Sequence, residues 1–282
     1  MTIVEERRVD AHQHFWRYQP ERDAWIANDM AAIRRDFLPD DLEGVLADAG
    51  LHASVAVQAD QSLDETRFLL GLAGEHHFVN GVVGWVDLLA PDLEPTLEAI
   101  SEDPLLVGIR HVAQAEDDDW LAREDVAAGI QRLARFGLTY DILVYHRQLP
   151  AALTLVDRLP SQPFVVDHLA KPPIRAAALE PWATNMRELS RRPNVWCKLS
   201  GMVTEADWRS WTPADLNPYV DVVLEAFGPE RLMFGSDWPV CLLAADYSEV
   251  VDAVEEVATT LSPAERADVF GGTARRFYGL ST

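Results

Sequence analysis

Short apolar runs that alternate with capped helical segments constrain the fold of this chain more than any other feature. The runs are rich in β-branched residues, and several are apolar throughout, as in strands buried on both faces of a parallel sheet. Helical signals separate them: Ser62 and Glu65 form a capping box, and Gly50 and Gly137 each follow an amphipathic segment. The predicted strands span residues 9–14, 54–58, 79–86, 105–110, 138–144, 164–168, 195–200 and 232–236.

About eight strands, each followed by a helix, predict a (β/α)8 barrel, and the 282 residues fit one such domain. We therefore expect a single domain over residues 1–282. A doubly wound open sheet is the main rival, but it would need a glycine-rich phosphate turn after the first strand, where His12, Gln13 and His14 stand instead. The predicted helices span residues 40–49, 62–74, 125–136, 181–191, 213–227 and 247–261, with a last one opening at residue 262.

Composition excludes several classes of protein. The net charge of −22, from 46 acidic and 24 basic residues, argues against binding to nucleic acid or to anionic membrane surfaces. No apolar stretch approaches the roughly 18 residues of a membrane span, and residues 1–8 are too charged for a secretory signal. Cys197 and Cys241 are too few for a disulfide framework. We expect a cytoplasmic protein and leave a homo-oligomer open.

The distribution of histidines indicates where chemistry would occur, because barrel enzymes act at the carboxyl ends of their strands. Three of the eight histidines precede predicted strands, whereas five end or follow one: His12, His14, His111, His146 and His168. Side chains alternate along a strand, so His12 and His14 should point to the same side. We expect both to converge with His168 and Asp237, although a buried structural histidine and a capping aspartate are the plainer alternatives.

Six motifs in chain order carry a family resemblance. They are residues 10–16 (DAHQHFW), 83–88 (VGWVDL), 108–111 (GIRH), 166–172 (VDHLAKP), 198–201 (KLSG) and 234–239 (FGSDWP). Together they resemble the amidohydrolase superfamily in its amidohydrolase-2 branch, and most of all the sugar-lactone hydrolases of the L-fuconolactonase and L-rhamnonolactonase type.

This resemblance implies a distorted (β/α)8 barrel of the amidohydrolase type that hydrolyses a five- or six-membered aldonolactone, such as a fucono-, galactono- or rhamnonolactone. Asp237 would act as the general base that takes a proton from water. The lactone carbonyl would be polarised by Zn²⁺ or by a protonated histidine at position 12, 14 or 168.

The metal content is left open by the sequence. Residues 138–144 contain no lysine or histidine where binuclear members of the superfamily carry an additional ligand, so we do not expect a two-metal site. One Zn²⁺ could be held by His12, His14, His168 and Asp237, whose nitrogen and oxygen atoms it prefers. Some relatives of this lactonase type work without metal, so both possibilities stand.

A polyol pocket needs amphipathic aromatic faces and hydrogen-bonding groups near the strand ends. Any of the tryptophans could instead belong to the core. The chain has only two lysines, Lys171 and Lys198, and neither they nor His146 receive a role. The predicted substrate-binding residues are Trp16, Gln58, Trp85, Arg110, His111, Tyr145 and Trp238.

Three other functions compete with sugar-lactone hydrolysis. A pyrone-dicarboxylate lactonase would need cations for two carboxylates, and only Arg110 is an evident candidate in this acidic chain. A decarboxylase of the same branch would need a firmly bound metal. A metabolite-binding barrel without catalysis would be expected to have lost part of the His/Asp set, which is intact here.

Overall fold

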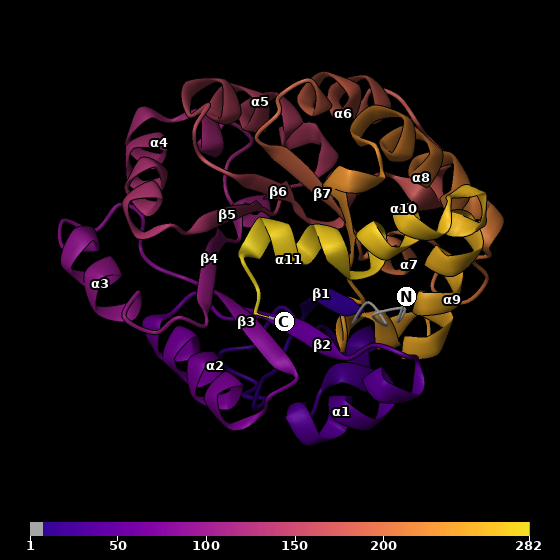
Figure 1. Ribbon diagram of the computed structural model, residues 1–282, viewed down its shortest axis with the longest axis horizontal. Coiled ribbons are helices and arrows are strands. Elements are labelled where there is room, and N and C mark those ends of the chain that lie inside the picture. Colours follow the sequence, from indigo (N-terminus) through magenta and orange to yellow (C-terminus); the bar gives the residue numbers. More distant parts are fainter. Residues whose placement is uncertain (1–7, 282) are drawn as a thin grey trace, which may run out of the picture.

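The computed structural model describes residues 8–281, in which eight parallel strands form one sheet (Figure 1). The strands follow one another in chain order, each paired with the next. Their bounds are β1 Val9–Gln13, β2 Ala53–Val57, β3 Val79–Gly84, β4 Leu106–His111, β5 Thr139–Ile142, β6 Phe164–Val166, β7 Val195–Leu199 and β8 Leu232–Phe234.

Between β1 and β8 the barrel is closed by a single parallel bridge, which joins Gln13 to Trp238. Helices surround the strands on the outside (Figure 1). The predicted (β/α)8 barrel is therefore confirmed, while the single domain over residues 1–282 stays a prediction because residues 1–7 and 282 lie outside the described part.

The α-helices begin and end close to the sequence signals. They are α1 Pro39–Asp48, α2 Leu63–Glu75, α3 Leu93–Ile100, α4 Glu124–Gln131, α5 Leu149–Arg158, α6 Trp182–Ser190, α7 Met202–Glu205, α8 Pro213–Phe227, α9 Tyr247–Val257, α10 Pro263–Ala267 and α11 Thr273–Tyr278.

Two predicted helices are shorter than expected. The segment 125–136 divides into α4 and a tighter turn, Arg132–Phe136, which ends at Gly137 with a left-handed φ of 70°. The segment 247–261 leaves the α-helical conformation after Val257 and passes into a single 3₁₀ turn.

Several predicted strands are also shorter than the sequence suggests, and two of them end just before a sharp turn. Residues 164–168 and 232–236 leave the sheet after Val166 and Phe234. Just beyond these ends, His168 and Asp237 adopt left-handed backbone angles, with φ of 53° and 58° respectively. The chain therefore turns sharply at the two places where the sequence predicted functional side chains.

The barrel interior forms an apolar core of its own near the amino ends of the strands. Val9, Val107 and Val165 meet there, and α11 covers them with Ala274 and Tyr278. Figure 1 shows α11 running across this end of the barrel, close to the carboxyl terminus. This arrangement leaves the carboxyl ends of the strands as the open end.

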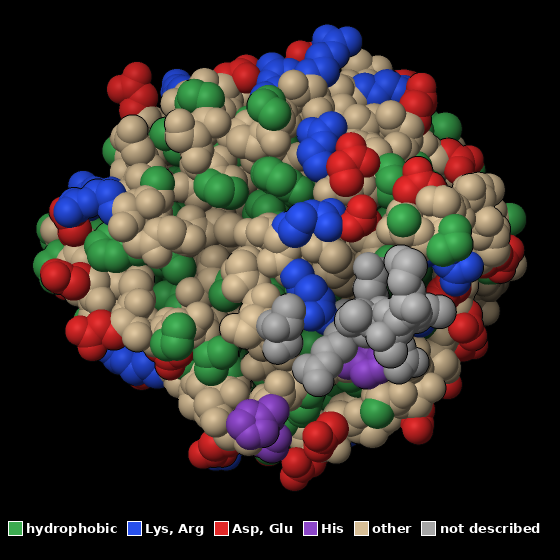
Figure 2. Space-filling model, viewed as in Figure 1, with side chains coloured by type: hydrophobic (Ala, Val, Ile, Leu, Met, Phe, Trp, Pro, Cys, Tyr) green, Lys and Arg blue, Asp and Glu red, His purple; other side chains and the backbone are tan. Residues whose placement is uncertain are grey.

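On the face that α11 covers, acidic and basic side chains are interspersed around the edge (Figure 2). His52, His76 and His77 precede β2 and β3 in the sequence, as expected for histidines away from the open end. Within residues 8–281, no helix is both long and apolar enough to cross a membrane.

Candidate active site

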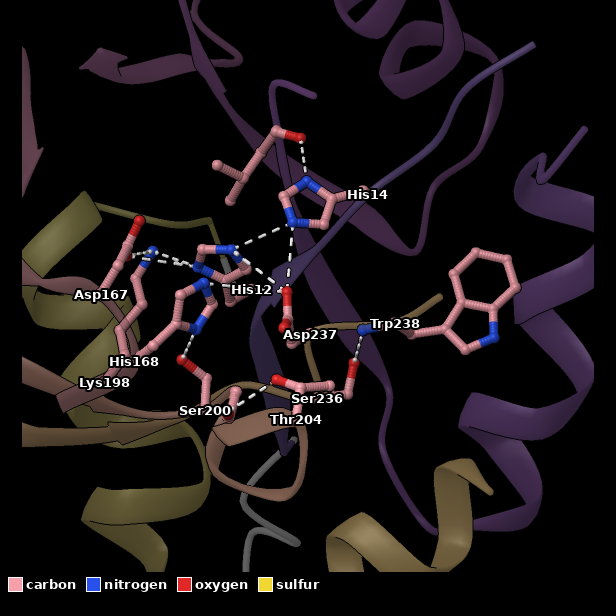
Figure 3. Close-up of polar contacts among 12 residues, drawn as sticks. His12, His14, Asp167, His168, Lys198, Ser200, Thr204, Ser236, Asp237 and Trp238 are labelled. Carbon is pink, nitrogen blue, oxygen red and sulfur yellow. Dashed lines mark hydrogen bonds and ion pairs between the residues drawn. The ribbon is translucent and has the colours of Figure 1, made fainter. Parts of the chain in front are cut away.

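Barrel closure brings the first strand against the segment that follows the last one. His14 N donates to Trp238 O at 2.7 Å, and Asp237 N donates to His12 O at 2.8 Å. These two bonds place Asp237 beside both histidines of the first motif (Figure 3). The two ends of the sequence therefore form one site.

A buried carboxylate anchors this closure from below. Asp10 accepts hydrogen bonds from Ser236 N at 2.9 Å, from Ser236 Oγ at 2.6 Å and from the Tyr247 hydroxyl at 3.0 Å. Ser236 Oγ in turn accepts from Trp238 N at 3.0 Å. Burial raises the pKa of Asp10 to about 6, and the hydrogen bonds oppose that rise. Asp10 thus fixes the turn that carries Asp237.

Three imidazoles converge on one oxygen of Asp237 (Figure 3). The Nε2 atoms of His14, His168 and His12 lie 3.3, 3.8 and 3.9 Å from Asp237 Oδ1. All four side chains are at most 6% exposed. The convergence predicted for these four residues is what the structure contains, while their catalytic roles stay predictions.

Each imidazole is oriented through its other nitrogen. His14 Nδ1 donates to the carbonyl of Val57 at 2.7 Å, and His168 Nδ1 lies 2.8 Å from Ser200 Oγ. His12 Nδ1 lies 3.1 Å from the Lys198 ammonium. Since Val57 O can only accept, the His14 Nδ1 atom carries a proton, and Nε2 is the ring nitrogen that faces Asp237.

Burial and neighbouring charges set the protonation of this group. Burial lowers the pKa of His12 well below its usual value and lowers that of His168 to about 4. Burial also acts to raise the pKa of Asp237. Three interactions outweigh burial and bring this pKa below its usual value: electrostatic interactions with His168 and with His12, and a hydrogen bond with His14. At neutral pH the site thus holds a carboxylate beside two neutral imidazoles.

A column of buried charges lies beneath His12. The Lys198 ammonium is 2.6 Å from Asp141 Oδ2 and 3.0 Å from Asp167 Oδ1, and all three side chains are fully buried. Arg110 Nη1 lies 3.2 Å from the other oxygen of Asp167. Tyr278 of α11 donates to Asp141 at 2.8 Å. Two cations and two anions therefore balance inside the barrel.

A cavity of about 360 Å³ opens above Asp237, within the range of roughly 300–1,000 Å³ usual for small-molecule sites. One part of its wall is apolar and includes two indoles, and the other is polar or charged. The lining residues are His14, Trp16, Trp25, Ala59, Asp60, Gln61, Arg110, Val112, Gln114, Ala115, Leu143, His168, Lys171, Asp237 and Val240.

Of the predicted substrate-binding residues, Trp16 and Arg110 line this cavity. Trp16 donates its indole N–H to Arg35 O at 2.9 Å, which fixes the ring. Arg110 donates to Gln58 O and to Asp167, so its terminal nitrogens already serve the protein.

The other five predicted residues do not line the cavity. Gln58 is fully buried and donates to the carbonyl of Arg110 at 3.3 Å. Trp238 packs edge-on against Phe37, with ring centroids 5.2 Å apart. Both positions face the core.

Trp85, His111 and Tyr145 form contacts beside the cavity. Trp85 Nε1 lies 3.3 Å from His111 Nδ1, and His111 stacks on Trp120 with centroids 4.3 Å apart. Tyr145 lies under the Lys171 ammonium, 5.6 Å from ring centroid to Nζ. Their roles in substrate binding stay predictions. In the structure, Trp85 and His111 contact each other, His111 packs on Trp120, and Tyr145 packs against Lys171.

Sequence reasoning missed Trp25, Gln61 and Lys171 as lining residues. Gln61 accepts from Val112 N at 2.8 Å through its Oε1. The NH₂ group is then the part of the amide that can donate to a ligand. Trp25 is 46% exposed, an unusual position for an indole. Two signals were available for Lys171: the rarity of lysine in the chain and its place in the motif at residues 166–172.

The donor atoms fit a single divalent ion. One atom each from His12, His168 and Asp237 lie within 4.8 Å of one another, and the set of two nitrogens and a carboxylate oxygen suits Zn²⁺. His14 lies outside that group, with its Nε2 at 3.3 Å from Asp237 Oδ1. On β5, Asp141 is committed to Lys198 and Tyr278.

Comparison with known proteins decides the family. Residues 9–280 match the amidohydrolase family model. The chain belongs to the amidohydrolase family. The resemblance seen in the sequence motifs is thereby confirmed.

Individual amidohydrolases cover almost the whole chain. The L-fucono-1,5-lactonase of Burkholderia multivorans is 45% identical over 97% of this chain and 96% of its own length. The L-fucono-1,5-lactonase of Burkholderia ambifaria is 42% identical over the same shares of the two chains. A crystal structure of an amidohydrolase from B. multivorans with bound zinc superposes with a TM-score of 0.93 at 45% identity, over 98% of this chain and 100% of that one.

Proposed function

We propose that this amidohydrolase opens a sugar lactone by hydrolysis, and that its substrate is a neutral aldonolactone of the L-fucono-1,5-lactone type. The observation that carries the proposal is the ionised Asp237 at the cavity wall, with three imidazole Nε2 atoms within 3.9 Å of one of its oxygens. The two relatives named L-fucono-1,5-lactonase supply the substrate class.

Asp237 is suited to both proton transfers of lactone hydrolysis. Its lowered pKa keeps it ionised at neutral pH, the form that can accept a proton from the attacking water, and also makes it a weaker base than an ordinary carboxylate. The same low pKa makes the protonated carboxyl a strong acid, able to return that proton to the ring oxygen as the acyl–oxygen bond breaks. One residue thus serves as base and then as acid.

The histidines and Asp10 hold Asp237 in position for these proton transfers. The backbone bonds between Asp237 and His12 and between His14 and Trp238 hold the carboxylate at a fixed place in the cavity. A divalent ion held by His12, His168 and Asp237 would add Lewis-acid polarisation of the lactone carbonyl. A lactone is already more reactive than an amide, so its hydrolysis requires less polarisation of the carbonyl.

The cavity suits a polyol more than a dianion. Trp25 offers an indole face on which a sugar ring can pack, and the Gln61 amide can donate to a hydroxyl. Arg110, the cation predicted from the sequence, already faces Asp167. Among the lining residues, Lys171 is then the cation that remains for the two carboxylates of a pyrone dicarboxylate.

The test is a panel of lactones followed by acid release with a pH indicator. L-fucono-1,5-lactone, galactonolactone and rhamnonolactone are compared with a pyrone dicarboxylate, on protein assayed for metal and with or without chelator. We expect the L-fucono lactone to have the highest kcat/KM. Faster turnover of the dicarboxylate, or no turnover of any sugar lactone by folded protein, would contradict the proposal.

A further inference from the structure

A rare backbone conformation holds one wall of the cavity. Four consecutive non-glycine residues, positions 168 to 171, have positive φ values of 53°, 52°, 57° and 48°. Lys171 N donates to His168 O at 2.7 Å, which closes a left-handed turn. L-residues adopt such turns only where the surrounding structure enforces them, and enforced strain is often found at functional sites.

The surroundings of this turn do enforce it. Leu169 and Ala170 are fully buried, and the Trp182 indole donates to Leu169 O at 2.6 Å. On the other side, a Cβ at Gly201 would lie 2.6 Å from His168 Nδ1, so the absence of a side chain there admits the turn. Packing thus compensates a conformation that the chain alone would avoid.

The turn places two side chains on one side. In a turn of about three residues, positions i and i+3 eclipse one another. His168 and Lys171 accordingly both line the cavity above Asp237. An extended strand through these residues would have turned them to opposite faces.

Lys171 lies in the cavity wall, and its ammonium is not committed to a strong interaction there. Its Nζ lies 3.2 Å from Glu205 Oε1, in a pair whose side chains are 18% and 22% exposed, and it lies over the Tyr145 ring. His146 Nδ1 donates to the Lys171 carbonyl at 3.0 Å and fixes the backbone. A partly exposed ion pair is weak, so this ammonium can exchange partners. The Arg110 charge, by contrast, faces the fully buried Asp167.

Lactone hydrolysis creates a charge that the substrate lacks. Water oxygen bonds to the carbonyl carbon, the bond from that carbon to the ring oxygen breaks, and the ring oxygen takes a proton. The resulting hydroxy acid then loses a proton to solvent and becomes a carboxylate. The cavity wall already carries Asp237 and Asp60, so this new anion needs a counter-charge.

We propose that Lys171 binds the carboxylate of the product aldonate, and that the left-handed turn at residues 168–171 brings its ammonium to the His168 wall for that purpose. The inference rests on the proposed function, because it takes its ligand from that reaction. Lys171 would then bind the anionic product more strongly than the neutral lactone. It would likewise stabilise the negative charge that develops as the lactone becomes the product.

Calorimetric titration tests this without requiring turnover. Sodium L-fuconate serves as the anionic probe and L-fucitol as the neutral probe of similar shape. We expect Lys171→Met to weaken L-fuconate binding by about tenfold or more, as for a lost charged hydrogen bond, and to leave L-fucitol binding within about twofold. Lys171→Arg should retain most of the L-fuconate affinity.

Glu205→Gln is the matched control, because it should change the L-fuconate affinity in the opposite direction. It releases the ammonium from its partner while leaving the lining residues unchanged, so L-fuconate should bind about threefold more tightly. Unchanged L-fuconate binding in folded Lys171→Met would overturn the proposal. If that variant does not fold, unchanged or weaker binding in Glu205→Gln overturns it. Failure of the proposed function is distinct, since the wild-type protein would then hydrolyse no sugar lactone.

Discussion

Replacement of Lys198 by methionine perturbs the charge balance inside the barrel. The ammonium lies 2.6 Å from Asp141 and 3.0 Å from Asp167, and Arg110 is the second cation of the group. Methionine retains the length and the apolar stem but removes the charge. One carboxylate is then left without a counter-charge in a fully buried place.

The expected loss is large for a single substitution. Breaking a buried ion pair by removing one partner typically costs about 3–5 kcal/mol, because the remaining charge stays desolvated. Domains of this kind have total stabilities of about 5–15 kcal/mol, so the loss is readily measured. We expect urea denaturation at about pH 8 to show a decrease of about 3–5 kcal/mol in the free energy of unfolding.

A double variant supplies the control. Lys198→Met with Asp141→Asn restores the balance of one cation, Arg110, and one anion, Asp167, while the amide oxygen can still accept from Tyr278. The double variant should therefore be more stable than the sum of the single losses implies, by about 1–3 kcal/mol.

The pH dependence gives a further check. Burial raises the pKa of Asp141 to about 6, and loss of Lys198 would raise it further. A carboxyl whose folded pKa exceeds its unfolded pKa takes up a proton on folding, so its contribution to stability is lost as pH rises. The destabilisation by Lys198→Met should thus be smaller at about pH 6 than at about pH 8.

Two results would refute this reasoning. One is a loss below about 1 kcal/mol with an unchanged denaturant m-value, the range of an exposed ion pair. The other is a double variant no more stable than the sum of the single losses implies.

Three further predictions concern other parts of the molecule. Asp237→Asn keeps the shape of the side chain but removes its basicity, so kcat should fall by roughly 10²–10⁴, and near-normal turnover by folded protein would remove Asp237 as the base. Burial raises the pKa of Glu65 to about 7, so its ionisation costs stability as pH rises through that value. The free energy of unfolding of Glu65→Gln relative to wild type should therefore increase by roughly 2–3 kcal/mol as pH rises from about 5 to about 8 in chemical denaturation. A difference that does not depend on pH would contradict this. Ala177 is exposed with φ of 48°, so Ala177→Gly should stabilise by about 0.5–1 kcal/mol, whereas Ala47→Gly at an exposed position of helix α1 should destabilise by a similar amount. Equal effects of the two glycines in thermal unfolding would contradict the strain at position 177.

Elements of the barrel that depend on local signals were predictable from the sequence. Apolar runs, capping boxes and terminal glycines act within a few residues, so the order of strands and helices followed from them. The common orientation of His12 and His14 followed from strand alternation, and the structure brings both to Asp237. The six motifs identified the family without reference to the fold.

Residues whose position depends on packing between distant segments were decided only by the tertiary structure. The left-handed turn at 168–171 is one case: local preference favours a strand through His168, and only the packing of Leu169, Ala170 and Gly201 reverses that preference. Lys198 is another, because its partner Asp141 lies on β5, its partner Asp167 directly follows β6, and the two meet it only when the barrel forms. Periodicity along the chain can say which way a side chain points, but its partner depends on register between strands far apart in sequence.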